Sequence, residues 1–211
     1  MSQQETKQEF TGTITAVKAR IRLLRSFDQI SHAYLGYVLV LDGKLNGQPV
    51  EELRIAVGPK SHEKNQFRIG DQVSGMAVAV ADEEKEWATH YRVSGLRLLA
   101  RGPAEQVAPP NPDGGIAPPL PDYRARGHRR LDGKTYSANC QCCPFGLVMP
   151  TEITIDQWDP SKKRWRFETH CYGPRDCPMY RPGRPYQVPG RKPGMVWEDD
   201  DVEREKGGED S

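Results

Sequence analysis

The residues best suited to chemistry in this 211-residue chain are its cysteines. All five lie between residues 140 and 177, and the first 139 residues contain none. The N-terminal sequence MSQQETKQEF lacks the apolar core of a signal peptide, so we expect a cytoplasmic protein. Because the cytosol keeps thiols reduced, clustered cysteines there are typical of metal ligands rather than of disulfides.

The cysteines fall into two groups that resemble each other. Cys143 and Cys177 are each followed by proline and then an apolar residue, and each has an upstream thiol. Two such pairs can close a tetrahedral site with sulfur about 2.3 Å from the ion. The sequence therefore predicts a zinc ion held by Cys140, Cys143, Cys171 and Cys177. Replacement of one ligand by Cys142 or His170 stays open, as does an iron–sulfur cluster instead of zinc.

A β-hairpin is predicted between the two cysteine groups. Residues 150–158 and 164–170 have the composition of strands, and Asp159-Pro160-Ser161-Lys162 has the composition of a turn. We expect Ile153, Ile155, Trp165 and Phe167 to form its apolar face. A module this small has little core of its own, so the metal is expected to supply much of its stability.

The first hundred residues predict five strands, at residues 10–24, 33–43, 50–57, 74–81 and 87–101, with a short helix or loop at 59–67. In the first strand the apolar residues stand at even positions up to Ile14 and at odd positions from Val17. One continuous apolar face then requires a bulge or bend near Ala16.

This order of elements, with Gly70-Asp71-Gln72-Val73 as the turn that opens the fourth strand, resembles the OB-fold. The resemblance implies binding of single-stranded nucleic acid; an SH3-like barrel is the rival fold. Residues 155–178 are also similar to an uncharacterised group of prokaryotic proteins that join an OB-like domain to a four-cysteine module. The expected fold class is all-β, with a five-stranded OB-like barrel and a small zinc-stabilised β-hairpin module.

Composition divides the chain into four parts. Residues 1–102 form the expected barrel, and residues 103–123 form a linker that contains 7 of the 18 prolines. The cysteine-rich module, residues 124–193, has 14 basic and 6 acidic side chains, whereas the tail at 194–211 has 2 basic and 8 acidic ones. A basic block before an acidic tail suggests that a polyanion binds the block, with a tail that competes for that surface or only aids solubility.

Basic side chains interleaved with aromatic ones can contact phosphates while stacking bases. The second face of the first strand is expected to display Lys18, Arg20 and Arg22 to solvent. The predicted nucleic-acid-binding residues are Lys18, Arg20, Arg22, Arg25, Tyr34, Arg129, Arg130, Lys163, Arg164 and Arg166. Trp158 and Trp165 offer further rings for stacking.

The leading hypothesis is a protein that binds single-stranded nucleic acid or structured RNA. A protein-interaction adaptor or ribosome-associated factor, with a protein partner, is the alternative. An enzyme is disfavoured, because the chain has no glycine-rich phosphate loop, paired-histidine motif or serine-centred elbow. No apolar run approaches the roughly 18–20 residues that span a bilayer, so no membrane association is expected.

Overall fold

The computed structural model describes residues 6–26, 30–103, 116–156 and 158–184. Most of the expected linker and the whole expected acidic tail lie outside these residues. No helix within the described ranges is both long enough and apolar enough to cross a membrane.

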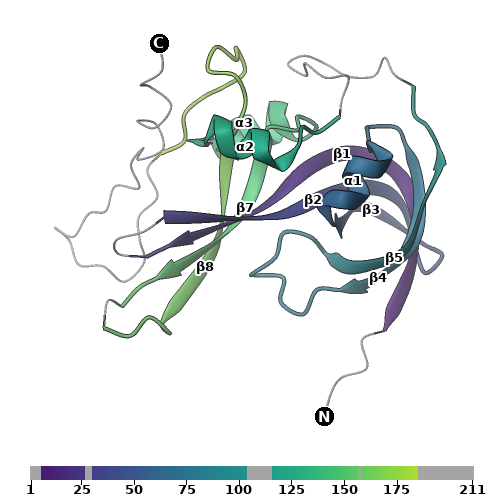
Figure 1. Ribbon diagram of the computed structural model, residues 1–211, viewed down its shortest axis with the longest axis horizontal. Helices are drawn as coiled ribbons and strands as arrows, with labels where there is room; N and C mark the ends of the chain where they lie inside the picture. The colour runs from purple at the N-terminus through teal and green to yellow at the C-terminus, as the bar shows by residue number, and fades with distance from the viewer. Residues whose placement is uncertain (1–5, 27–29, 104–115, 157, 185–211) are drawn as a thin grey trace.

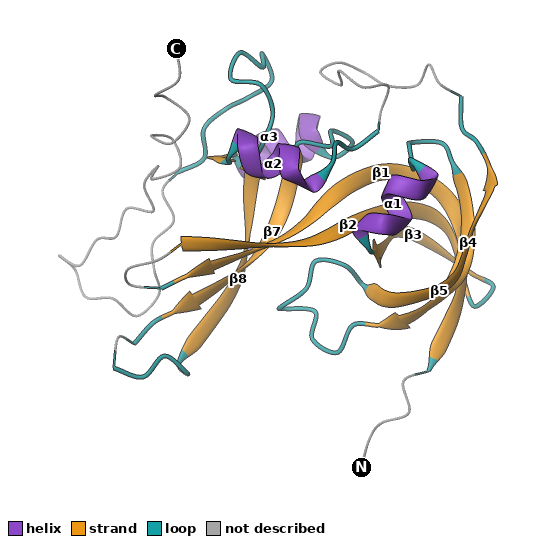
Figure 2. Cartoon of the chain, viewed as in Figure 1, coloured by secondary structure: helices purple, strands orange, loops and turns teal. Residues whose placement is uncertain are grey.

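The protein is mostly β-structure, as the sequence predicted (Figure 2). One sheet has the strand order β2-β3-β5-β4-β1-β7-β8-β6. Its strands are β1 (Lys7–Arg25), β2 (Ile30–Leu45), β3 (Gln48–Val57), β4 (Gln72–Ala79), β5 (His90–Ala100), β6 (Arg129–Arg130), β7 (Gly146–Thr154) and β8 (Lys163–Cys171). Four short helical segments accompany them: α1 (Pro59–Asn65), α2 (Leu120–Arg126), α3 (Gly133–Thr135) and η1 (Tyr136–Cys140), the last a turn of π-helix.

Five strands close into a ring, because β1 pairs with β2 as well as with β4. The ring runs β1-β2-β3-β5-β4-β1 and is antiparallel except where β3 meets β5 at Ile55 and His90. Figure 1 shows the ring, with α1 beside it and the β7–β8 hairpin on the other side of the molecule. The interior holds apolar side chains such as Phe10, Leu39 and Val73.

The predicted bend near Ala16 is confirmed by a shift in the β1–β2 register between Ile14 and Ala16. The shift lets one strand bury Phe10 and Ile14 before it and Val17 and Ile21 after it. β1 therefore buries apolar side chains on one side from Phe10 to Leu23, although its sequence changes phase.

β1 continues beyond the ring and joins the second half of the chain. Leu23 to Arg25 pair in parallel with Thr151 to Ile153 of β7, and β7 pairs with β8 as an antiparallel hairpin. α2 crosses the linker boundary expected at residue 123, where Tyr123 is buried and its hydroxyl donates to the Pro144 carbonyl at 3.0 Å. Phe145, Leu147 and Met149 belong to the same core cluster as the ring residues.

The pairing of β7 with β8 differs from the apolar face that the sequence predicted for the hairpin. Residues directly opposite each other in an antiparallel pair lie on the same face. Ile153 pairs with Arg164, whereas Trp165 pairs with Glu152 and Phe167 with Pro150. Ile153 is buried, but Phe167 is 41% exposed. The expectation that Ile153 lies with Trp165 and Phe167 was wrong, because it assumed a register of β7 against β8 that is one residue away from the observed one.

Lys18 of β1 links the ring to the cysteine-rich half of the chain through a buried contact, and its side chain is only 1% exposed. Its Nζ donates to the carbonyls of Cys140 (2.7 Å), Cys143 (2.5 Å) and Gly146 (2.8 Å). Burial lowers the pKa of Lys18 from 10.5 to about 8, so the group remains an ammonium at neutral pH. An ammonium has three N–H donors, and here all three meet a carbonyl. The prediction that Lys18 faces solvent and contacts nucleic acid was therefore wrong.

Replacing Lys18 with Met should destabilise the whole fold. The change removes the ammonium from three carbonyls, of which those of Cys140 and Cys143 keep only a backbone amide donor, at 3.2 and 3.3 Å. The expected loss in unfolding free energy is about 3–5 kcal/mol. Lys44→Met, at an exposed position of β2, should cost no more than about 0.5 kcal/mol. Urea unfolding monitored by tryptophan fluorescence measures both, and equal losses in the two variants would contradict the role assigned to Lys18.

Candidate functional site

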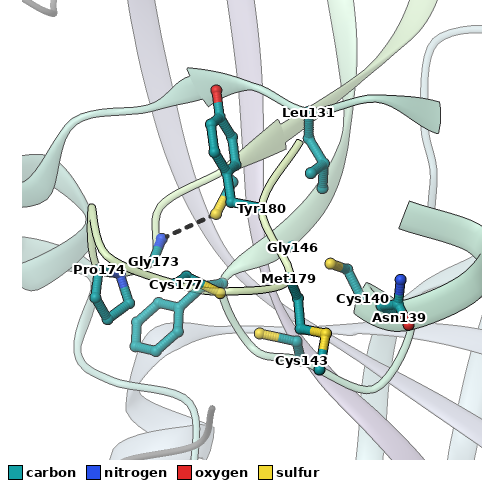
Figure 3. A pocket seen from close by; sticks show the side chains of 12 residues that line it. Leu131, Asn139, Cys140, Cys143, Gly146, Gly173, Pro174, Cys177, Met179 and Tyr180 are labelled. Carbon is teal, nitrogen blue, oxygen red and sulfur yellow. Dashed lines mark hydrogen bonds between the residues drawn. The ribbon is translucent and has the colours of Figure 1, made fainter. Parts of the chain in front are cut away.

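The structure brings the four predicted zinc ligands around one small cavity. Cys140 ends η1, Cys143 lies in the turn that follows, Cys171 ends β8, and Cys177 lies in the loop after it. Figure 3 shows their side chains lining the cavity together with Met179 and Tyr180. Cys142 is exposed and His170 is fully buried, and neither lines this cavity.

The predicted zinc site is nevertheless wrong. Within the described part of the chain, no group of three or more His, Cys, Asp or Glu side chains is placed to hold a metal ion, and all five cysteines are free. The Cys171 sulfur instead accepts a hydrogen bond from the Gly173 amide at 3.3 Å. Burial raises the pKa of Cys171 and brings that of Cys140 to about 11, which favours the neutral thiol over the thiolate that metals bind. The spacing of the cysteines indicated only that the two thiols of each pair can come close to each other. It carried no information on how the two pairs are placed relative to one another.

The cysteine-rich module is held in place without that metal. Its strands continue the sheet of the ring, and Phe145 and Tyr172 pack in the shared core. The argument that a small module needs a metal assumed a core of its own, whereas this core is common to both halves.

Arg25 was also predicted to be exposed and to contact nucleic acid, and this prediction was wrong. Its side chain is 5% exposed and binds the buried Glu168 at 2.9 Å. Arg166 binds the other oxygen of the same carboxylate at 2.7 Å. Two cations against one buried carboxylate form a structural ion-pair cluster between β1 and β8.

Histidine rings pack beside this cluster. His128 lies with its ring centroid 4.7 Å from that of His32 and 4.7 Å from that of His170. His170 Nε2 is 3.7 Å from the Glu168 carboxylate. Burial, and then the charges of His128 and Arg25, lower the pKa of His170 well below 6.5.

Arg20 and Arg22 lie beside the carboxylate of Glu86, in the loop between β4 and β5. The Nε and Nη2 atoms of Arg20 both donate to Glu86, whose side chain is 9% exposed, and Arg22 lies 3.9 Å from the same oxygen. Ala88 of this loop is buried against Val38 and Ala56 on the outside of the ring. The loop therefore lies across the outer face of the ring and fixes both guanidinium groups.

A cleft of about 390 Å³ opens on this outer face, which we call the β2–β5 cleft. Residues of β1, β2, β3 and β5 line it, including Arg20, Leu35, Ala56, Tyr91, Arg92 and Leu96. It is thus an open, partly apolar site with two guanidinium groups and a phenol ring.

Arg92 reaches the cleft because β5 is bulged there. Met76 pairs with Ser94 and Val78 with Tyr91, so one residue of β4 stands opposite two of β5. Arg92 has a φ of 53°, which non-glycine residues adopt rarely and mostly at special positions. Its guanidinium lies over the Tyr91 ring at 5.0 Å. The sequence analysis missed both residues; the only local signal was the broken apolar alternation around them.

The other predicted contacts are distributed over three places. Tyr34 lies under the Arg124 guanidinium beside α2, at 4.9 Å. On β6, Arg129 stacks on the Tyr180 ring at 4.0 Å, and Arg130 is half-buried next to it. Near the turn of the hairpin, Lys163 binds Glu152 and Arg164 is exposed. Only Arg20 among the predicted residues lines the β2–β5 cleft.

No known protein family, curated protein or solved structure matches this chain. The functional conclusion therefore comes from the geometry of the cleft and its charged groups.

Mild acid should destabilise the fold through its buried histidines. Burial lowers the pKa of His170, His62 and His90, so between pH 6.5 and the folded-state pKa the unfolded chain binds more protons. Stability present above pH 6.5 is then lost as the pH falls, by up to about 1.4 kcal/mol per pH unit for each histidine.

The free energy of unfolding, measured in urea from pH 7.5 to 5, should fall less steeply in His170→Gln than in the natural protein. His62→Gln serves the same comparison if the first variant does not fold. Parallel profiles for the variant and the natural protein would contradict this account.

Proposed function

We propose that this protein binds single-stranded nucleic acid in the β2–β5 cleft. The observation that carries the proposal is the presence of Arg20, Tyr91 and Arg92 in one open cleft on the outside of a five-stranded ring. Guanidinium groups neutralise phosphates, and a phenol ring stacks on any base, which is the combination used by proteins that bind single strands.

The order of the strands supports this choice. We assign the ring as an OB-like barrel, since its order β1-β2-β3-β5-β4-β1 and the helix between β3 and β4 are those of that fold. OB-folds bind oligonucleotides on the face of their second and third strands, between the first and fourth connecting loops. The β2–β5 cleft includes Leu35 of β2 and Ala56 of β3, and the loop that carries Glu86 is the connection between β4 and β5.

Glu86 orients Arg20 for this role. It engages Nε and Nη2, while Nη1 of Arg20 makes no hydrogen bond to any residue that the structure describes. A guanidinium held along one edge presents its other edge to a ligand without a further loss of side-chain entropy. Arg20 and Arg22 share the single carboxylate of Glu86, so this pair of guanidinium groups retains positive charge for a phosphate.

A protein-interaction adaptor is the second candidate, and Trp158 is the observation that favours it. Its side chain is 90% exposed at the end of the β7–β8 hairpin, where the Asp156 carboxylate accepts hydrogen bonds from the amides of Trp158 and Asp159. An exposed tryptophan on an ordered turn is typical of protein interfaces. Loss of a nuclease-resistant partner on Trp158→Ala in a pull-down would support this candidate.

Arg92→Gly should weaken the binding of single-stranded DNA or RNA. Glycine accepts the positive φ at this bulge, so the change removes the guanidinium without adding backbone strain. We expect affinity to fall several-fold, and the slope of log affinity against log salt to become shallower by about 0.7. Fluorescence anisotropy of a labelled oligonucleotide across a salt series measures both quantities.

Arg97→Ala is the matched control, because Arg97 is an exposed arginine on the same strand that does not line the cleft. It should reduce affinity by less than Arg92→Gly does. Equal losses would place binding outside the cleft, and no binding by the natural protein at low salt would reject the proposed function.

A further inference from the structure

The β7–β8 hairpin has one face in the core and one in solvent. On the core face Met149 and Ile153 are buried, while Arg166 and Glu168 form the ion-pair cluster with Arg25. Lys163, Trp165 and Phe167 alternate with those residues along β8 and so lie on the opposite face. On β8 the outer face of the hairpin thus carries a row of one cation, which is bound to Glu152 of β7, and two aromatic rings.

Phe167 is the more exposed of the two rings. It is 41% exposed, whereas the phenylalanines of the core, Phe10, Phe67 and Phe145, are at most 1% exposed. A large ring left in solvent on a regular strand contributes little to folding. Rings on the open face of a sheet are, however, what sheet proteins use to stack the bases of a single strand.

Contacts of Arg22 connect this row to the β2–β5 cleft. The Arg22 guanidinium lies over the Trp165 ring at 5.3 Å. Arg22 is also 3.9 Å from the Glu86 oxygen that binds Arg20, and Arg20 lines the cleft. The two sites are therefore connected by Arg20 and Arg22, which share the largely buried Glu86 carboxylate.

We propose that Trp165 and Phe167 form a second stacking site, which takes further nucleotides of the strand bound in the β2–β5 cleft. This inference rests on the proposed function and deepens it, since it sets the length of strand that the protein holds. Arg22 lies against the Trp165 ring and supplies a cation for a phosphate backbone, whereas Lys163 is bound to Glu152 on the same face. Two rings on an open sheet face, one of them with an arginine against it, fit a nucleic acid better than a protein partner, whose contact would favour a contiguous apolar patch.

The test compares two lengths of oligothymidylate, about 5 and about 15 nucleotides, chosen to fill one or both sites. Phe167→Leu keeps an apolar side chain but removes the ring. It should weaken binding of the long oligonucleotide about tenfold, as expected for one lost base stack, and change binding of the short one less than twofold. Phe167→Tyr should retain the affinity of the natural protein for both.

Leu99→Ala is the matched control, because Leu99 is 55% exposed on β5 and belongs to neither site. It should change neither affinity, and melting curves establish that each variant is folded. An equal effect of Phe167→Leu on both lengths, or an effect on neither, would overturn the second site and leave the proposed function standing. Failure of the natural protein to bind either oligonucleotide would overturn the proposed function itself.

Discussion

The contact on which the rest of the structure depends is the buried ammonium of Lys18. Its three donors are all used by carbonyls of the turn from Cys140 to Gly146. That turn leads directly into β7, so the contact fixes where β7 begins beside β1. The parallel pairing of the two strands then places β8 so that Trp165 meets Arg22. A single satisfied charge thus aligns the surface of the hairpin with the outer face of the ring.

The same interaction explains why the cysteine spacing led to the wrong prediction of a zinc site. Their spacing is that of metal ligands, yet in the structure the segment that carries Cys140 and Cys143 presents its backbone carbonyls to Lys18. The sheet, the shared core and the Arg25–Glu168–Arg166 cluster provide the stability that the sequence analysis assigned to zinc. The thiols that line the small cavity are then side chains of the fold itself, buried at Cys140 and Cys171 and half-buried at Cys143 and Cys177.

Residue types that are neighbours in sequence predicted most of the strands and turns. What the sequence did not predict depends on packing between segments that are far apart in the chain. The bend near Ala16 and the turn from Asp159 to Lys162 follow from residue types that are adjacent in sequence, and both are present. For residues 59–67 the sequence left a short helix or a loop open, and Pro59–Asn65 form a helix. Alternation also identified the two faces of β1, but it could not show that a segment over 120 residues away covers Lys18. The position of Arg92 depends on a bulge, which is set by the pairing of β4 with β5.

The central claim is that the ring and the hairpin present one continuous surface to one strand of nucleic acid. Photochemical cross-linking of a 15-nucleotide, 5-iodouracil-substituted strand, followed by peptide mapping of the one-to-one complex, tests it most directly. The account predicts that peptides containing Tyr91 and peptides containing Phe167 are both cross-linked in that complex. Cross-links confined to other parts of the molecule, such as α2 or the end of the hairpin at Trp158, would contradict it.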